Sequence, residues 1–412
     1  MIFILPFLLI FSSCGSFIKR IDEQQNNFVT IPQVEKTYCA PTNHKLILMN
    51  SEPTSQAEFE RMIKDRGYSP VEQFVLWSLV QMAGRPDVNS PESQFEVFVD
   101  GPKSTRYFRF TLEQYKYPMI EGLAVILKSY SAKRTLRELI QRMESDFPSL
   151  AVIDNDLEIF INKYEEAIKL NPALKEVFMR AGETLKAGEK FKRNSYLKLL
   201  PLIPKTEENA TSIPLLANEQ SKVPLTCNFS LQSYDESLYS VQEKINPNYT
   251  FGLSNDTFTF MASTSLAFKT VETLPGLIWL KADPDSHHGR FDVAACLYED
   301  PINKKKMALL STDSRDPGQH LYHLFQYDMG KIKSAQEMDS LLKFSRHLFL
   351  TDPLRLIYES HRGTEKQLTE LLKLNIPIYN ANLLGHITIF LHTPEEKTFI
   401  LDNRHKASLT CH

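Results

Sequence analysis

The chain has 412 residues, of which 42% are hydrophobic and 24% charged, and its formal net charge is −3. These proportions are typical of a folded globular protein that is long enough for two domains or more. The slight acidic excess excludes a nucleic-acid-binding surface, because such a surface needs a concentrated basic excess. Beyond the first fifteen residues the sequence contains no apolar run long enough to span a membrane, and no motif that indicates a cofactor.

The N-terminus begins with an unbroken apolar run from Ile2 to Phe11, which is followed by Ser12, Ser13 and Cys14. A run of about ten apolar residues suits the core of a signal peptide and is too short to cross a bilayer. Small residues before a cysteine resemble the lipobox of bacterial lipoproteins. This resemblance implies that residues 1–13 are a signal peptide and that Cys14 is lipidated. The alternative is an ordinary signal peptide, whose cleavage would release a secreted protein.

Residues 14–45 follow as a polar stretch that we interpret as the lipidated cysteine and its tether. A lipid on Cys14 would make the membrane a partner of the mature chain. Gly15 and Ser16 carry no acidic retention signal, so the resemblance to bacterial lipoproteins favours the outer membrane. The sequence thus predicts a cell-envelope protein, and leaves open which envelope protein or glycan it contacts.

Four cysteines follow Cys14, at positions 39, 227, 296 and 411. In an oxidising compartment this even number permits two disulfides, with three possible connectivities. Cys39 and Cys411 lie near the chain ends, which often approach each other in compact folds, so we expect these two to pair. No CxxC or Cys/His spacing typical of a structural zinc site is present.

From residue 46 to residue 200 the hydrophobic period is mainly helical. Ser55 begins one predicted helix, and Ser69 with Pro70 begins the next. Further helical patterns cover residues 118–145, 154–170 and 172–192. Two strand-like runs, Phe95–Val99 and Tyr107–Leu112, predict a hairpin inside this helical domain.

Residues 201–224 contain four prolines among polar residues and predict a linker between two domains. After it, short runs rich in β-branched and aromatic residues predict strands. These strands are expected at 250–253, 257–262, 277–281, 291–298, 306–311, 386–391 and 397–401, with helices at 334–347 and 364–374. The predicted fold class is α+β, with a helical N-terminal domain at 46–200 and a mixed antiparallel-sheet domain at 225–412.

Ten of the eleven histidines fall between positions 287 and 412. His287 and His288 are adjacent in a turn-like stretch, and His320 and His323 have the i, i+3 spacing that places two ligands on one face of a helix. These four residues are the candidate ligands of a divalent metal ion. No HExxH or comparable metalloenzyme motif accompanies them.

The C-terminal part contains the sharper candidate site. A predicted helix leads to Ile376 and Pro377, His386 begins a strand, and Asp402 ends the next one. This arrangement resembles the second half of a transglutaminase-like or papain-like core. The resemblance implies that His386 acts as a general base whose imidazole is oriented by Asp402.

The nucleophile of that core is missing from its expected place. In the family a cysteine begins the helix before the Ile-Pro turn, and the corresponding position here is Ser360. Either Ser360 replaces the cysteine, or a remote cysteine such as Cys227 or Cys296 serves, or the core is inactive.

The leading hypothesis from the sequence is therefore a cell-envelope lipoprotein with a non-catalytic binding or interaction role. It is preferred over an enzymatic role because the set of catalytic residues is incomplete. The first alternative is a cysteine or serine hydrolase that uses His386 and Asp402. The second is a divalent-metal-binding envelope protein.

Overall fold

The computed structural model describes residues 36–40, 44–49, 53–64, 66–203, 216–217, 225–228, 248–268, 270–283, 293–314, 316–351, 354–381, 384–404 and 408–412. The predicted signal peptide, Cys14 and most of the predicted tether lie outside these residues, as does most of the expected linker. Among the described residues no helix has the length and apolar character needed to cross a bilayer.

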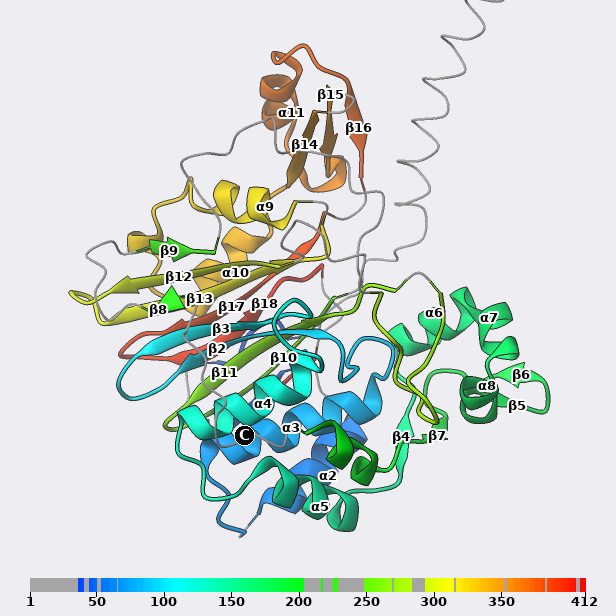
Figure 1. Cartoon of the computed structure of the whole chain (residues 1–412). Helices are drawn as coiled ribbons and strands as arrows, with labels where there is room; N and C mark the ends of the chain where they lie inside the picture. Colours follow the sequence, from blue (N-terminus) through cyan, green and yellow to red (C-terminus); the bar gives the residue numbers. More distant parts are fainter. Residues whose placement is uncertain are drawn as a thin grey trace, which may run out of the picture.

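The described elements alternate between helices and strands along the whole chain (Figure 1). The helices are α2 (Pro53–Ile63), α3 (Pro70–Gly84), α4 (Pro118–Ser129), α5 (Leu136–Asp146), α6 (Asn155–Lys163), α7 (Glu165–Leu170), α8 (Pro172–Phe178), α9 (Pro317–Leu324), α10 (Ala335–Leu342) and α11 (Glu365–Leu372), with 3-10 turns η1 (Tyr196–Leu202), η5 (Met329–Lys331) and η6 (Ser360–Arg362). The strands are β1 (Leu46–Met49), β2 (Gln94–Asp100), β3 (Thr105–Phe110), β4 (Leu150–Val152), β5 (Met179–Arg180), β6 (Glu183–Thr184), β7 (Lys190–Lys192), β8 (Leu216–Ala217), β9 (Leu225–Cys227), β10 (Asn248–Asn255), β11 (Thr259–Ser265), β12 (Ala294–Asp300), β13 (Lys305–Thr312), β14 (His347–Thr351), β15 (Leu354–Tyr358), β16 (Ile378–Asn380), β17 (His386–His392), β18 (Lys397–Leu401) and β19 (Leu409–Cys411).

Two sheets form the centre of the molecule. A seven-stranded sheet has the order β19-β1-β10-β11-β2-β3-β8, and a five-stranded sheet has the order β18-β17-β13-β12-β9. Within both sheets the described strands pair antiparallel. A smaller sheet, β14-β15-β16, carries α11 and projects from one side (Figure 1).

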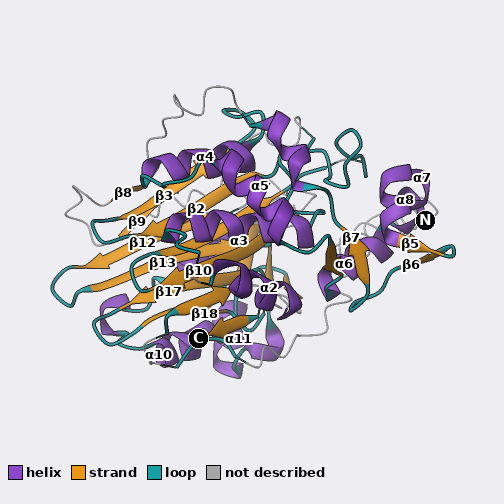
Figure 2. Ribbon diagram, turned by 90° about the horizontal axis from the view of Figure 1, so that it is seen from below, coloured by secondary structure: helices purple, strands orange, loops and turns teal. Residues whose placement is uncertain are grey.

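Each central sheet has helices on its outer face, which gives four layers in the order helix, sheet, sheet, helix. Helices α2 to α5 cover the seven-stranded sheet, as Figure 2 shows from below. Phe74 of α3 stacks on Phe260 of β11 with ring centroids 4.5 Å apart. On the other side, α9 and α10 pack on the five-stranded sheet through an apolar cluster that includes Leu321, Met338 and Ile389.

The local sequence explains where several of these elements begin. The hydroxyl of Ser69 accepts a hydrogen bond from the Glu72 amide, and the Glu72 carboxylate accepts one from the Ser69 amide. This capping box satisfies two donors that a helix start otherwise leaves free. It confirms the predicted start of α3 at Pro70.

The α+β fold class is confirmed, but the division into two domains at residues 201–224 is wrong. Strand β2, from the first half of the chain, pairs along its whole length with β11 from the second half. Strand β1 pairs with both β10 and β19. The hairpin expected inside a helical domain is thus the middle of a sheet that both halves build, because strand partners are chosen by packing and need not be neighbours in sequence.

Two further predictions of secondary structure are wrong. Residues 277–281 form no strand, and only an isolated bridge joins Leu280 to Thr273. The stretch 172–192 is helical only in α8, and it continues as the short strands β5, β6 and β7. Gly182 and Gly188 both have positive φ, +89° and +87°, and turn the chain between these strands. Glycine adopts this conformation without the steric cost that other residues meet.

The layer between the two sheets is apolar at its centre. Met261 and Phe98 from the seven-stranded sheet meet Leu310, Phe390 and other side chains of the five-stranded sheet in one buried cluster. The sheets approach closely here, since a Cβ on Gly252 would lie 2.8 Å from the Phe399 ring.

One end of this layer is closed by ionic contacts between the sheets. Asp100, at the end of β2, contacts Nζ of Lys306 at 3.2 Å and Nδ1 of His392 at 3.0 Å. The Thr105 hydroxyl donates to the same carboxylate at 2.7 Å. Burial favours a raised pKa for Asp100, but the His392 hydrogen bond, the Lys306 charge and the Thr105 hydrogen bond together lower it below its ordinary value.

The four cysteines at positions 39, 227, 296 and 411 form two disulfides. Cys39 pairs with Cys411, as expected from the proximity of the chain ends, and Cys227 pairs with Cys296. The first bond joins residues 372 positions apart, and the second joins facing residues of the adjacent strands β9 and β12.

We expect the Cys39–Cys411 bond to contribute most to stability, because it closes the longer loop in the unfolded chain. Replacing both of its cysteines with serine should lower the free energy of unfolding by about 2–5 kcal/mol. The same change at Cys227 and Cys296 should lower the free energy of unfolding by about 1–2 kcal/mol less, because this disulfide closes a shorter loop in the unfolded chain. Denaturant unfolding of the three proteins measures both values, and equal midpoints for all three would contradict the expectation.

The Asp100 contacts predict a specific acid sensitivity. The pKa of Asp100 is lower in the folded than in the unfolded chain. Its carboxylate therefore stabilises the fold at pH values above the ordinary aspartate pKa of about 3.9. That stabilisation is lost as the pH falls through the folded pKa. Asp100→Asn should therefore destabilise the protein by about 1–3 kcal/mol at pH 7 and by clearly less at pH 3. Unfolding curves at the two pH values test this, and an equal loss at both would refute it.

Candidate active site

The opposite end of the layer between the sheets is polar. Side chains alternate between the two faces of a strand, so Ser263 and Ser265 share the face of Met261, which packs between the sheets. By the same alternation Glu96 shares the face of Phe98, and Arg109 shares that of Tyr107. Polar groups of these three strands, β11, β2 and β3, therefore face the second sheet.

The register of the seven-stranded sheet places these polar residues in two rows. In one row Thr250, Ser263, Glu96 and Arg109 stand opposite one another on β10, β11, β2 and β3. In the other row Asn248, Ser265 and Gln94 face one another. Directly opposed residues have Cβ atoms about 5 Å apart, so each row is a continuous polar strip.

Part of the first row is internally paired. Nε of Arg109 lies 3.0 Å from Oε1 of Glu96, and the Tyr107 hydroxyl donates to the other oxygen of the same carboxylate. The charge of Arg109 is therefore compensated. The Ser263 hydroxyl is buried and has no hydrogen-bond partner among the described residues. A buried hydroxyl of this kind is available to a bound molecule.

The five-stranded sheet contributes a hydroxyl next to an imidazole. Thr312 ends β13 and His386 begins β17, and the two residues face each other in the antiparallel register. Oγ1 of Thr312 lies 2.7 Å from Nε2 of His386. Both residues share the face of Leu310 and Phe390, which points to the layer between the sheets.

Asp313 places a carboxylate beside the same imidazole nitrogen. Its Oδ2 lies 3.3 Å from Nε2 of His386. Its Oδ1 accepts hydrogen bonds from the backbone and the side-chain amide of Asn248, at 3.2 and 3.3 Å. Asp313 thus joins the imidazole of one sheet to the first residue of β10 in the other sheet.

The turn that leads into His386 needs a glycine. Gly385 has a φ of +56°, and a Cβ there would lie 2.7 Å from the carbonyl oxygen of Thr312. A side chain at this position would force Thr312 and His386 apart. The backbone geometry therefore supports the hydroxyl–imidazole contact.

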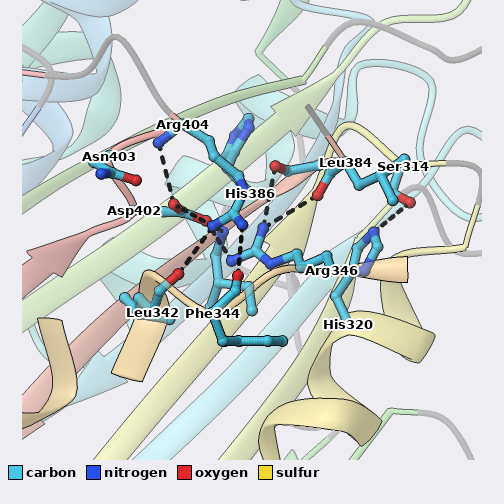
Figure 3. Close-up of polar contacts among 12 residues, drawn as sticks. Ser314, His320, Leu342, Phe344, Arg346, Leu384, His386, Asp402, Asn403 and Arg404 are labelled. Carbon is cyan, nitrogen blue, oxygen red and sulfur yellow. Dashed lines mark hydrogen bonds and ion pairs between the residues drawn. The ribbon is translucent and has the colours of Figure 1, made fainter. Parts of the chain in front are cut away.

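The structure places the predicted catalytic residues His386 and Asp402 in different surroundings. His386 lies at the polar end of the layer, where it contacts Thr312 and Asp313. Asp402 is fully buried nearby, but its carboxylate binds the guanidinium groups of Arg346 and Arg404 (Figure 3). In the described contacts the carboxylate at the imidazole of His386 is that of Asp313, and not that of Asp402 as predicted.

Ser360 and the two cysteines do not supply the missing nucleophile. Ser360 is exposed at the start of η6, next to the small sheet. Cys227 and Cys296 are joined in a disulfide, which removes both thiols from nucleophilic chemistry. The hydroxyl found beside His386 is that of Thr312, which sequence reasoning missed.

The expected metal ligands have separate partners where the structure describes them. Nε2 of His320 lies 2.7 Å from the Ser314 hydroxyl (Figure 3), and the ring of His323 stacks on His347 with centroids 4.0 Å apart. Burial lowers the pKa of His323 to about 3 and that of His347 to about 4, so both are neutral near pH 7. His287 and His288 lie outside the described residues.

Metal ligands gather at one other place in the described part of the chain. Cys39, His44 and Cys411 have ligand atoms within 4.8 Å of one another. The two cysteines form a disulfide, so they offer no thiolate to a metal ion.

The fold is similar to that of three solved structures. A variant of LmbA2991 matches with a TM-score of 0.62 and 8% sequence identity, over 89% of this chain and 98% of that one. A second form, LmbA2991HD, matches with a TM-score of 0.59 and 10% identity over the same shares. The cephalosporin acylase from Bacillus halodurans matches with a TM-score of 0.57 and 9% identity, over 89% of this chain and 96% of that one. No protein-family model and no curated protein sequence matches the chain.

These likenesses establish the fold and correct two expectations. The transglutaminase-like or papain-like core is replaced by two stacked antiparallel sheets between helical layers. The leading hypothesis of a non-catalytic binding role is wrong, because nearly the whole chain has the fold of a protein named an acylase, which is an enzyme.

Proposed function

We propose that this protein is an acyl-transfer hydrolase that cleaves an amide or ester bond at the polar end of the layer between its two sheets. The observation that carries the proposal is the 2.7 Å contact between the Thr312 hydroxyl and Nε2 of His386. A hydroxyl is a weak nucleophile by itself, and an adjacent imidazole that accepts its proton activates it. The similarity of the fold to an acylase supports the same class of reaction.

The geometry suits two consecutive steps. In the first, Oγ1 of Thr312 bonds to the carbonyl carbon while Nε2 of His386 takes the hydroxyl proton. The resulting imidazolium is stabilised by the Asp313 carboxylate at 3.3 Å. The proton then passes to the departing amine or alcohol. In the second step His386 takes a proton from water while the water oxygen bonds to the acyl carbon. The bond between that carbon and Oγ1 of Thr312 then breaks, the carboxylic acid leaves, and the imidazolium returns its proton to Oγ1.

The facing sheet supplies groups that would bind the substrate. The Ser263 hydroxyl is a buried donor and acceptor that no described residue satisfies. It belongs to the polar row that begins at Thr250 and ends at the Glu96–Arg109 pair. A polar acyl group would find a hydrogen-bond partner in the Ser263 hydroxyl, whereas an aliphatic chain would leave that hydroxyl unpaired.

Replacing Thr312 with valine should abolish the reaction while keeping the shape of the side chain. With p-nitrophenyl acetate and acyl p-nitroanilides as substrates, Thr312→Val and His386→Gln should each lower kcat/KM by about 100-fold or more. Thr312→Ser should retain activity, because it keeps the hydroxyl.

Thr388→Val is the matched control for this experiment. Thr388 is a buried threonine on β17, two residues from His386 and on the same face of the strand. This variant should keep the wild-type rate. If Thr312→Val hydrolyses the substrates as fast as the wild type, Thr312 is not the nucleophile and the proposal fails.

We also propose that the enzyme works in a bacterial cell envelope, anchored by a lipid on Cys14. Support comes from the lipobox resemblance and from the pairing of all four remaining cysteines, since disulfides persist in oxidising compartments. The substrate would then be an amide or ester that is present outside the cytoplasm.

The anchor can be tested by fractionating bacteria that express the full chain. The wild-type protein should sediment with membranes, and its N-terminal residue should be Cys14 with the mass of attached acyl chains. Cys14→Ser should lose this modification and should no longer be processed as a lipoprotein. An unmodified N-terminus downstream of residue 14 in the wild type would contradict the anchor.

A further inference from the structure

A buried group of four charges lies next to His386 and joins the small sheet to the five-stranded sheet. It consists of Arg346, before β14, Glu359, after β15, and Asp402 and Arg404, after β18. All four side chains have 0% exposure. The two positive and two negative charges compensate one another, as burial requires.

Two of these residues hold the chain on both sides of His386 (Figure 3). Nη1 of Arg346 donates to the carbonyl oxygens of Leu384 and Gly385, at 3.2 and 3.1 Å. The carboxylate of Asp402 accepts a hydrogen bond from the Ile387 amide at 3.1 Å. Arg346 and Asp402 are themselves joined by an ion pair.

Glu359 and Arg404 complete the set. Oε1 of Glu359 accepts a hydrogen bond from the Leu384 amide at 2.7 Å, and Nε of Arg404 donates to the same oxygen at 2.8 Å. Arg404 also donates to Asp402 at 3.1 Å. The backbone groups of Leu384, Gly385 and Ile387, which flank His386, are therefore all hydrogen-bonded to this one network of charged side chains.

Asp402 and Arg346 stay ionised in the folded protein. Burial favours a raised pKa for the Asp402 carboxyl, but the charges of Arg346 and Arg404 hold it well below its ordinary value. Burial lowers the pKa of Arg346 to about 10, which still leaves the guanidinium charged near pH 7. Its hydrogen bonds to the backbone are thus charge-assisted and strong.

We propose that Arg346 and Asp402 are positioning residues, which fix the backbone at Leu384–Ile387 and so direct the imidazole of His386 at the Thr312 hydroxyl. Neither side chain needs to touch the substrate. The inference rests on the proposed function for its kinetic consequence, because a displacement of about 1 Å at a reacting group can cost 100-fold in rate.

The planar guanidinium is essential to this role. It binds two carbonyl oxygens and a carboxylate at once, which the single ammonium of a lysine cannot reproduce. Arg346→Lys keeps the charge and loses this geometry, and Asp402→Asn keeps the shape and loses the charge. Each should lower kcat about 10- to 100-fold and leave KM within about threefold, because substrate-binding groups lie on the facing sheet.

A second measurement does not depend on activity. In 15N NMR spectra of the imidazole nitrogens, the wild type should give one hydrogen-bonded set of His386 signals. Arg346→Lys and Asp402→Asn should shift or split that set. Asp313 lies 3.3 Å from Nε2 of His386, and the charge of Asp402 also acts on the imidazole, so the spectra are recorded at one fixed pH. If the wild type has no hydrolase activity, the proposed function fails, and these spectra still decide the positioning role.

Two controls separate positioning from general destabilisation. Arg134→Lys alters another ion pair with a fully buried carboxylate, that of Glu72, in the helical layer, and should change neither kcat nor the His386 signals. Arg346→Gln combined with Asp402→Asn removes both charges together and so avoids a lone buried charge if the single variants do not fold. Folded Arg346 or Asp402 variants with wild-type kcat and unchanged His386 signals would overturn the proposal.

Discussion

Two sheets that pack face to face must fill the layer between them, and in this protein that layer is apolar only at its centre. Phe98, Met261 and Phe390 fill the middle, and Asp100 closes one end through contacts with the second sheet. At the other end both sheets present hydroxyl, amide and charged groups. Burying such groups costs free energy unless they are paired, so a stable fold keeps them only where partners or a ligand satisfy them.

The account of His386 follows from the same constraint. Its imidazole meets the Thr312 hydroxyl and the Asp313 carboxylate inside the layer. The backbone on either side is held by Arg346 and Asp402, whose buried charges cancel within a larger network. Such a network contributes little net stability compared with an apolar core, and its value lies in fixing one geometry. A fixed geometry is what a proton transfer between a hydroxyl and an imidazole requires.

Local signals in the sequence predicted the elements whose causes are local. Ser69 and Pro70 predicted the start of α3, and the runs around Cys296 and Met307 predicted the strands β12 and β13. The stretch after α8 was misread as helix, although Gly182 and Gly188 mark the turns of β5 to β7. The two-domain division failed because the pairing of β2 with β11 joins segments more than 150 residues apart, which no local pattern reveals.

For the candidate site too, some residues could be predicted from the sequence and others could not. His386 was found because it begins a strand in a recognisable run, but its true partners were not. Thr312 lies 74 residues away in sequence and meets the imidazole only through the register of β13 and β17. Asp402 was expected to orient the imidazole, and it binds Arg346 because the small sheet brings that guanidinium into the core. Contacts of this kind depend on tertiary packing, which one sequence does not specify.

The central claim is that Thr312 is an activated nucleophile, and covalent labelling tests it most directly. A fluorophosphonate probe reacts with hydroxyl groups that a neighbouring base activates. Intact-mass analysis should show one adduct per chain, peptide mapping should place it on Thr312, and Thr312→Val should remove it. An unlabelled wild-type protein, or an adduct on another residue such as Ser360, would contradict the account.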